Sequence, residues 1–338
     1  MGRVADQSAS EAPLVSVSML TYNAVDYVEE ALRSVLAQEV DFPVEIVVGD
    51  DCSRDGTQEI LADYARRYPD VIRLHLHCVR GSGVPGRVNN MHNLASCRGR
   101  YIAILDGDDY WLTTEKLQRQ IAFLESHHDY SAVGSDGIVR TPNGSRAALL
   151  PELRGADVGF DTLARFAVTG LTPSGLIFRR AAALPLPEWF EDIIVADHYL
   201  FGFLMRAGKI RLLPERYFCY RLHDTSFSAT YLPDQSVDPF RIYDDYERHA
   251  QLFPELPTSW LLDWRRVVTL LRTTTAAARA RRWGVVRGGL ERLRAIGLRR
   301  LFIALAGGTT GMLKRALTAS NGVQRAYEPT VAHAAPSF

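Results

Sequence analysis

Three carboxylates within four residues are the feature of this sequence that most directly indicates chemistry. They lie in Asp106-Gly107-Asp108-Asp109, directly after the apolar run 101–105. A strand that ends there brings its carboxylates to the edge where an open α/β sheet binds ligands. Without a partner these groups would repel one another and resist desolvation, and a hard cation such as Mg²⁺ or Mn²⁺ relieves both problems. The quartet therefore predicts a metal site that holds a substrate phosphate; the alternative is an acidic surface turn.

Two other predicted strands also end in polar side chains. The run 44–49 ends in Asp50 and Asp51, and the run 14–20 ends in Thr21-Tyr22-Asn23. An acidic residue at such a strand end can hold ribose hydroxyls, and polar groups at a neighbouring strand end can contact a base. The layout predicts a nucleotide-diphosphate site. The glycine motifs of dinucleotide enzymes and P-loop proteins are missing, which argues against both classes.

Apolar runs alternate with amphipathic segments through the first half of the chain, and this alternation is typical of a parallel, doubly wound α/β sheet. The second half mixes short strands, one helix and a loop rich in Asp at 234–245, and the chain is predicted to be helical from Trp260 onward. The predicted strands are 14–20, 44–49, 71–75, 101–105, 131–134, 175–179, 209–213 and 217–220, and the predicted helices are 25–38, 58–68, 88–96, 115–126 and 195–207.

Composition sets the outer limits of the interpretation. Hydrophobic content of 47% and charged content of 23% are typical of a globular protein. The four cysteines are scattered without zinc or redox spacing, which favours reduced thiols in a cytoplasmic protein, and neither a signal peptide nor a spanning helix is expected. We expect a disordered N-terminus at 1–13, two halves of one domain at 14–135 and 136–235, a basic helical extension at 255–320 and a disordered tail at 321–338.

Charge is distributed unevenly, although the formal net charge is zero. Residues 1–264 hold 25 bases and 37 acids, a net charge of −12, whereas 265–315 hold 13 bases and a single acid, Glu291. A basic amphipathic segment is typical of proteins that bind a membrane surface. Peripheral membrane contact through 265–315 and packing of this segment on the acidic body are both open, and no nucleic-acid partner is expected.

Taken together, the motifs resemble family 2 glycosyltransferases with the GT-A fold, over about residues 14–230. The resemblance implies a mixed doubly wound α/β sheet whose first half binds the nucleotide. It also implies an inverting enzyme that uses Mn²⁺ or Mg²⁺ and moves a sugar from a UDP- or dTDP-sugar to a hydroxyl acceptor in polysaccharide, glycolipid or natural-product glycosylation. The matching segments are Val15-Ser16-Val17, Thr21-Tyr22-Asn23, Asp50 to Thr57, Gly99 to Trp111, Ser174 to Arg179, Gly208-Lys209-Ile210 and Tyr220 to His223.

The resemblance also implies roles for individual residues. Asp106 and Asp108 form its D-x-D pair, with Asp106 near the ribose and Asp108 on the metal, and Asp51 would hold the base or ribose. Asn89-Asn90 stand where the family more often has Arg-Asn. The expected donor-binding residues are Thr21, Tyr22, Asn23, Asp51, Asn90, Asp106, Gly107 and Asp108. The expected metal ligands are Asp108, Asp106 and His223, whose neutral imidazole can complete a metal shell or contact the diphosphate. The expected acceptor contacts are Ser174, Trp111 and Asp109.

An inverting transfer also needs a base, which the family places at the start of a helix in the second half. Asp197 is our first choice and Asp192 the second. Asp197 shares one helix face with three apolar residues, Leu200, Phe201 and Leu204. Apolar surroundings make a carboxylate a stronger base. The structural alternative is that Asp197 only offsets the helix dipole.

Two other functions compete with sugar transfer. A nucleotidyltransferase on a similar sheet would carry a glycine-rich basic loop after its first strand, and Thr21-Tyr22-Asn23 offers none. An inactive sugar- or membrane-binding module would not need the acidic strand ends that this sequence retains.

Overall fold

In the computed structural model, a mixed sheet of ten strands runs through the chain from Val15 to Arg221. The structure describes residues 2–7, 12–78, 84–149, 151–160, 162, 171–226, 240–255 and 260–296. The order along the sheet is β10-β12-β8-β11-β6-β2-β4-β5, with β7 paired to β12 and β9 to β8. The strands are β2 (Val15–Thr21), β4 (Val44–Asp50), β5 (Ile72–Leu76), β6 (Tyr101–Asp106), β7 (Tyr110–Trp111), β8 (Tyr130–Thr141), β9 (Gly144–Ala147), β10 (Asp157–Val158), β11 (Ile177–Arg179) and β12 (Lys209–Arg221).

Strand direction decides where the functional residues gather. β5, β4, β2 and β6 are parallel neighbours, so their carboxyl ends lie at one edge of the sheet. β8 and β12 are also parallel to each other, and the short β11 runs antiparallel between β6 and β8. The edge at which β2, β4 and β6 end therefore continues across the whole sheet, which is where an open α/β sheet binds its ligands.

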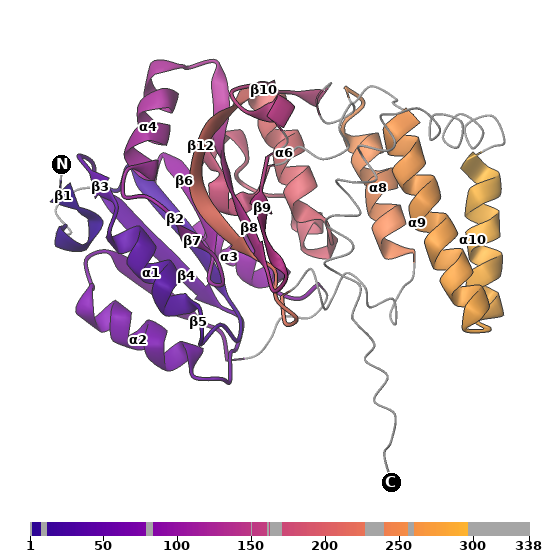
Figure 1. Ribbon diagram of the computed structural model, residues 1–338, viewed down its shortest axis with the longest axis horizontal. Helices are drawn as coiled ribbons and strands as arrows, with labels where there is room; N and C mark the ends of the chain where they lie inside the picture. The colour runs from indigo at the N-terminus through magenta and orange to yellow at the C-terminus, as the bar shows by residue number, and fades with distance from the viewer. Residues whose placement is uncertain are drawn as a thin grey trace, which may run out of the picture.

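Helices cover both faces of the sheet because its central strands are apolar on both sides (Figure 1). Helices α1 (Val28–Leu36), α2 (Thr57–Arg67) and α4 (Lys116–Ser126) share one core with Val17, Met19 and Ile46. Helices α3 (Arg87–Ser96) and α6 (Ala196–Ala207) share the other core with Val47 and Ile102.

Three further helices form a bundle beyond α6 (Figure 1). They are α8 (Arg241–Leu252), α9 (Trp260–Arg279) and α10 (Trp283–Ile296). Phe240, Tyr243 and Leu270 form their buried cluster. Phe253, just after α8, instead joins the core around α6, so the bundle is attached to the rest of the fold through α8.

The expected fold class is confirmed, since the sheet is mixed, helices cover both faces, and a helical region follows. The most central strands and the helices lie close to where the sequence predicts them. The two short strands predicted at 209–213 and 217–220 are instead one strand, β12, whose register shifts around Arg216. Pro214 lies next to that irregularity, and proline in a strand typically marks a bulge.

Two expectations of irregular structure are wrong in part. Disorder was expected at 1–13, but β1 (Gly2–Arg3) pairs with β3 (Glu39–Val40), and Val4 is fully buried. A loop was expected at 234–245, but α8 already begins at Arg241. The tail at 321–338 lies outside the described residues, as do 297–320 of the expected basic extension. No helix in the described part of the chain is long and apolar enough to span a membrane.

Candidate active site

A buried carboxylate connects the ends of β2 and β4 through hydrogen bonds. Asp50 is fully buried and accepts hydrogen bonds from Thr21 Oγ1 at 2.9 Å, from the Ser53 amide at 2.9 Å and from Gln58 Nε2 at 2.6 Å. Every interaction of this side chain is therefore directed inward. Asp50 therefore holds the ends of β2 and β4 together.

Residues expected to bind the nucleotide surround this edge. Tyr22 is 43% exposed and Asn23 is exposed, with a φ of 46°, and the Asn23 side chain accepts a hydrogen bond from the Arg54 amide at 3.0 Å. Asp51 is buried and accepts a hydrogen bond from the Gly86 amide at 3.1 Å, just before α3. Asn90 is half-buried in the following turn of α3. The loops after β2 and β4 thus meet the start of α3.

The acidic quartet occupies the end of β6 beside β2. The Gly107 amide donates to Leu20 O at 2.7 Å, and a Cβ at Gly107 would lie 2.5 Å from Thr21 Cγ2. Only glycine fits this close approach without displacing β2. Gly107 therefore has a packing role that places Asp106 and Asp108 beside the end of β2.

The negative charge of Asp197, although distant along the chain, acts on the acidic quartet. Burial, together with the negative charges of Asp108 and Asp197, raises the pKa of the Asp106 carboxyl to about 7, while the Arg87 guanidinium opposes this rise. The charge of Asp197, the first-choice base, therefore acts on Asp106, the first residue of the D-x-D pair. Asp192, the second choice, is exposed at the end of a 3₁₀-helix, Glu188–Asp192.

Two buried residues that the sequence did not indicate hold the segment leading to Asp197. Arg87 Nε donates to Ile193 O at 2.9 Å, and Arg87 Nη2 donates to Ile194 O at 3.0 Å. Asp245, on α8, accepts hydrogen bonds from the Ile194 amide at 2.6 Å and the Val195 amide at 3.3 Å. The same three-residue segment is therefore fixed through its carbonyls by α3 and through its amides by α8.

Two of the three residues expected to hold a metal are in contact with each other. His223 Nε2 lies 3.1 Å from Asp108 Oδ2, and both side chains are partly exposed. Two ligands of one ion can lie this close, and a cation would also relieve the repulsion between Asp106 and Asp108. Within the described residues, no three His, Cys, Asp or Glu side chains already have the arrangement of a metal site. Of the three expected ligands, Asp108 and His223 are the two whose side chains are in contact.

The three expected acceptor contacts lie in the interior instead. Asp109 and Ser174 are fully buried, and Ser174 Oγ donates a short hydrogen bond to Asp109. Trp111 is also buried, its indole N–H donates to Ser174 O at 3.0 Å, and the Lys116 amine lies 4.3 Å from the centre of its ring. Burial raises the pKa of the Asp109 carboxyl and lowers that of the Lys116 amine. These residues support the quartet from behind, so direct acceptor contact by them is not supported.

Arg221 is a further residue, within the matching segment Tyr220 to His223, to which the sequence analysis gave no role. It lies at the end of β12, its amide donates to Asp109 Oδ1 at 2.9 Å, and its Nη1 donates to Asp108 O at 2.7 Å. It also pairs with Glu30 on α1, and its guanidinium lies 4.3 Å from the centre of the Tyr110 ring. Arg221 therefore fixes the backbone of the quartet, and only its position two residues before His223 could have indicated this.

The mixed sheet, covered by helices on both faces and with carboxylates at the ends of its parallel strands, defines an α/β fold of the open-sheet class, and comparison with known proteins identifies the family. Residues 16–183 match the model of glycosyl transferase family 2. Through these residues the chain belongs to that family.

Curated relatives extend beyond the region that they share with this chain. An uncharacterized protein of Mycobacterium tuberculosis, Rv1520, is 31% identical over 211 residues, which cover 62% of this chain and 59% of the relative. The putative teichuronic acid biosynthesis glycosyltransferase TuaG of Bacillus subtilis is 37% identical over 131 residues, covering 37% of this chain and 50% of the relative. This chain thus spans little more than half the length of these relatives.

Solved structures share the fold at low sequence identity. The TarS fragment 1–349 of Staphylococcus aureus in complex with UDP-GlcNAc has a TM-score of 0.56 and 20% identity, covering 83% of this chain and 91% of that one. The mannosyltransferase PcManGT of Pyrobaculum calidifontis, in complex with GDP-Man and Mn²⁺, has a TM-score of 0.55 and 18% identity, covering 94% and 88%. Both matches support the GT-A fold.

Proposed function

We propose that this chain transfers a sugar from a nucleotide-diphosphate sugar to a hydroxyl acceptor, with inversion at the anomeric carbon. The observation that carries the proposal is that Asp106, at the end of β6, feels the negative charges of both Asp108 and Asp197, and Asp197 lies in the first turn of α6. A UDP- or dTDP-sugar is the favoured donor, and the TarS structure named above contains UDP-GlcNAc. The acceptor belongs to polysaccharide, glycolipid or natural-product glycosylation.

In this proposal the loops after β2 and β4 bind the nucleotide. Tyr22 offers an exposed ring for stacking on the base, with Thr21 and Asn23 shaping the pocket. Asp51 accepts hydrogen bonds from the base or ribose, and Asn90 faces the donor from α3. The four free cysteines fit a reducing compartment, so we place the reaction in the cytoplasm.

Asp108 and His223 would hold a divalent cation, Mn²⁺ or Mg²⁺, with Asp106 beside them. When bound, such a cation would neutralise the diphosphate leaving group. Arg221 keeps the Asp108 backbone in place, so the carboxylate needs little rearrangement before it binds.

Asp197 removes the proton of the acceptor hydroxyl, whose oxygen attacks the anomeric carbon as the bond to the diphosphate breaks. Asp197 is half-buried, and its helix face is apolar because Leu200 and Leu204 lie in the core. Arg87 and Asp245 hold the preceding segment, so the base is positioned from two sides.

Incubation with a panel of nucleotide sugars, an acceptor extract and Mn²⁺ or Mg²⁺ tests the donor half of the proposal. We expect metal-dependent release of nucleoside diphosphate, reduced at least about 100-fold in Asp108→Ala. The exposed Asp70→Ala variant, just before the start of β5, is the matched control and should keep full activity. Equal release by Asp108→Ala and wild type would refute the metal assignment, and release of pyrophosphate would instead indicate a nucleotidyltransferase.

Substitution of the two carboxylates near the start of α6 tests the base. We expect Asp197→Asn to lower transfer to the acceptor about 10²- to 10⁴-fold while donor binding persists. Asp192→Asn serves as both rival and control, because Asp192 is exposed and five residues away. If Asp192→Asn loses transfer and Asp197→Asn does not, the base is Asp192.

A further inference from the structure

Helix α10 has two chemically different faces. Its inner face packs on the bundle, where Val285, Leu293 and Ile296 contact the cluster of Phe240, Tyr243 and Leu270. Its outer face carries Trp283 at 68% exposure and Leu290 at 57%, two of the most exposed large apolar side chains among the described residues. Packing within the bundle therefore does not account for the apolar residues on the outer face.

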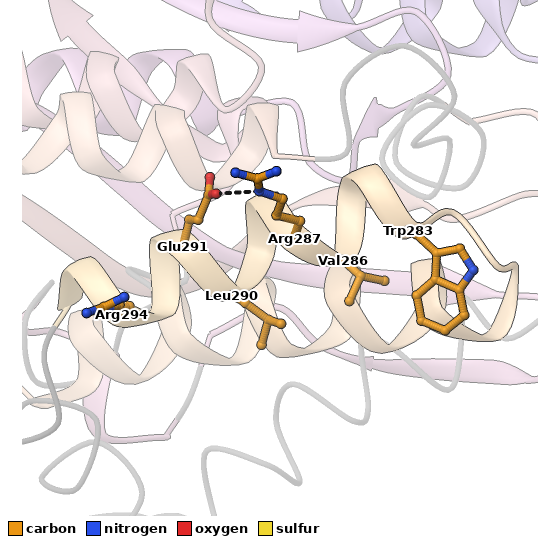
Figure 2. A pocket seen from close by; sticks show the side chains of 6 residues that line it. All are labelled: Trp283, Val286, Arg287, Leu290, Glu291 and Arg294. Carbon is orange, nitrogen blue, oxygen red and sulfur yellow. Dashed lines mark hydrogen bonds and ion pairs between the residues drawn. The ribbon is translucent and has the colours of Figure 1, made fainter.

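The outer face forms a shallow hollow with an apolar row and a charged border. Figure 2 shows Trp283, Val286 and Leu290 along one side of the helix, with Arg287 and Glu291 on the other. The remaining lining residue is Arg294. Arg287 and Glu291 pair with each other at 2.9 Å, so the one carboxylate of this face is already neutralised. We call this surface, Trp283 to Arg294 on α10, the outer α10 face.

Positive charge surrounds the apolar row. Exposed arginines lie at the end of α9, in the turn and on the outer α10 face, and the only acid between 279 and 294 is Glu291. The arginine of α10 that lies on its inner side, Arg292, pairs with Asp244 at 3.2 Å and thus belongs to the bundle. The exposed arginines are Arg279, Arg281, Arg282, Arg287 and Arg294.

The combination of apolar and basic groups decides between possible partners. A second copy would bring five exposed arginines against five others, which like-charge repulsion disfavours. A nucleic acid would use the arginines but leave Trp283 and Leu290 in water. An anionic bilayer surface uses both, because its phosphates meet the arginines while Trp and Leu enter the boundary between headgroups and acyl chains. The sequence after α10 continues with Arg299 and Arg300 before an apolar stretch, 301–313.

We propose that the outer α10 face docks on an anionic lipid surface. The catalytic edge of the sheet lies in another part of the molecule, so the docked protein would act on acceptors held at or near that membrane. Each arginine near the surface contributes about fivefold to the affinity. Trp283 supplies the apolar part of the contact, and a tryptophan that is largely exposed in the free protein can enter the interface without any unfolding.

Flotation of the full chain with lipid vesicles tests the proposal. Vesicles of phosphatidylcholine with about 30% phosphatidylglycerol should bind the protein at physiological salt, and pure phosphatidylcholine vesicles should not. Arg282→Gln/Arg294→Gln should weaken binding about 25-fold, and Trp283→Gln should weaken it at least about tenfold. Arg66→Gln/Arg119→Gln removes two exposed arginines from α2 and α4 and is the charge-matched control, with binding unchanged.

Several results would overturn the docking proposal. They are absence of binding to the anionic vesicles, equal binding by Trp283→Gln and wild type, and an equal loss in the charge-matched control. A dimer in sedimentation equilibrium that Trp283→Gln dissociates, with no vesicle binding, would assign the face to a second copy. Tight binding of a DNA oligonucleotide that does not depend on Trp283, again with no vesicle binding, would assign it to nucleic acid. Thermal melting of each variant shows that its fold is intact.

Discussion

A single buried arginine links the donor side of the site to the base. The guanidinium of Arg87 binds two carbonyls of the segment that leads to Asp197, and its charge opposes the rise in the pKa of Asp106. Arg87 is only 8% exposed. It therefore acts as a positioning residue whose effect on catalysis is indirect.

We expect Arg87→Gln to lower the turnover number about 100-fold, because a displacement of the base by about 1 Å is enough for such a loss. The Michaelis constant for the donor should change much less. Steady-state kinetics with saturating acceptor would measure both. Arg206→Gln is the control, since Arg206 also binds a backbone carbonyl, Leu252 O at 2.7 Å, but lies at the other end of α6. Similar losses in both variants would argue against a positioning role for Arg87.

The carboxylates of the site were predictable from sequence because each follows an apolar run directly. Asp106, Asp108 and Asp51 have that local context. Arg87 and Asp245 were not predictable, because the groups they bind are 106 and 51 residues away along the chain. The burial of Asp109 and Trp111 was missed for the same reason, since Ser174, their common partner, comes from a different element.

At the scale of elements, α8 connects the helical bundle to the base. Asp245 is 5% exposed, and its carboxylate accepts the amides of Ile194 and Val195 just before α6. The Tyr199 hydroxyl, on α6, donates to Asp245 O at 2.7 Å. The bundle is thus part of the support of the site.

Removal of that carboxylate should destabilise the protein. We expect Asp245→Ala to lower the free energy of unfolding by about 1–3 kcal/mol, because two buried amides lose their acceptor. Asp245→Asn should lower it less, since its amide oxygen can still accept one of the bonds. Urea unfolding followed by circular dichroism would measure the difference. If both variants match the wild type, α8 does not support the segment before α6.

Two glycines of α10 offer a matched pair for testing how the bundle packs. A Cβ at Gly289 would lie 2.0 Å from Thr274 Oγ1 on α9, whereas a Cβ at Gly284 would meet nothing within 4 Å. We expect Gly289→Ala to cost about 1–3 kcal/mol through overpacking. Gly284→Ala should stabilise by about 0.5–1 kcal/mol through helix propensity. Chemical denaturation of both variants decides, and equal effects would mean that α9 and α10 do not pack at this point.

Elements were predictable where the pattern is continuous. The apolar runs of β2, β4 and β6 identified those strands because both of their faces are buried. The predicted range of β8 was too short, because the buried polar residues Ser135 and Asp136 interrupt the apolar pattern of this strand. The antiparallel course of β11 has no local signal, since pairing direction depends on neighbours that are distant in sequence.

Across the whole molecule, a histidine cluster makes stability depend on pH. His75 on β5 lies 5.1 Å, ring to ring, from His92 on α3, and His77 lies 5.5 Å from His92. Burial lowers the pKa of the His75 imidazole below its ordinary 6.5, and the nearby His92, Arg73 and His77 add to this. The unfolded chain therefore binds a proton more readily than the folded protein does.

Stability should consequently fall as the pH drops below about 6.5, because protonation favours the unfolded state there. When the pH falls from about 7.5 to about 5.5, the free energy of unfolding should decrease less in His75→Gln than in the wild type. Exposed His128→Gln is the control and should follow the wild type. Urea titrations at the two pH values would measure this, and identical pH dependence in His75→Gln and wild type would refute the assignment.

The chain contains only three lysines, and one of them, Lys116, has its amine fully buried over the Trp111 ring. A second, Lys209, is 59% exposed. An amine-directed acylating reagent should therefore modify Lys209 in the folded protein and reach Lys116 only through openings of the molecule. The ratio of the two labelling rates, measured by mass spectrometry, would report how often the core around Lys116 opens, with Lys209 as the internal reference.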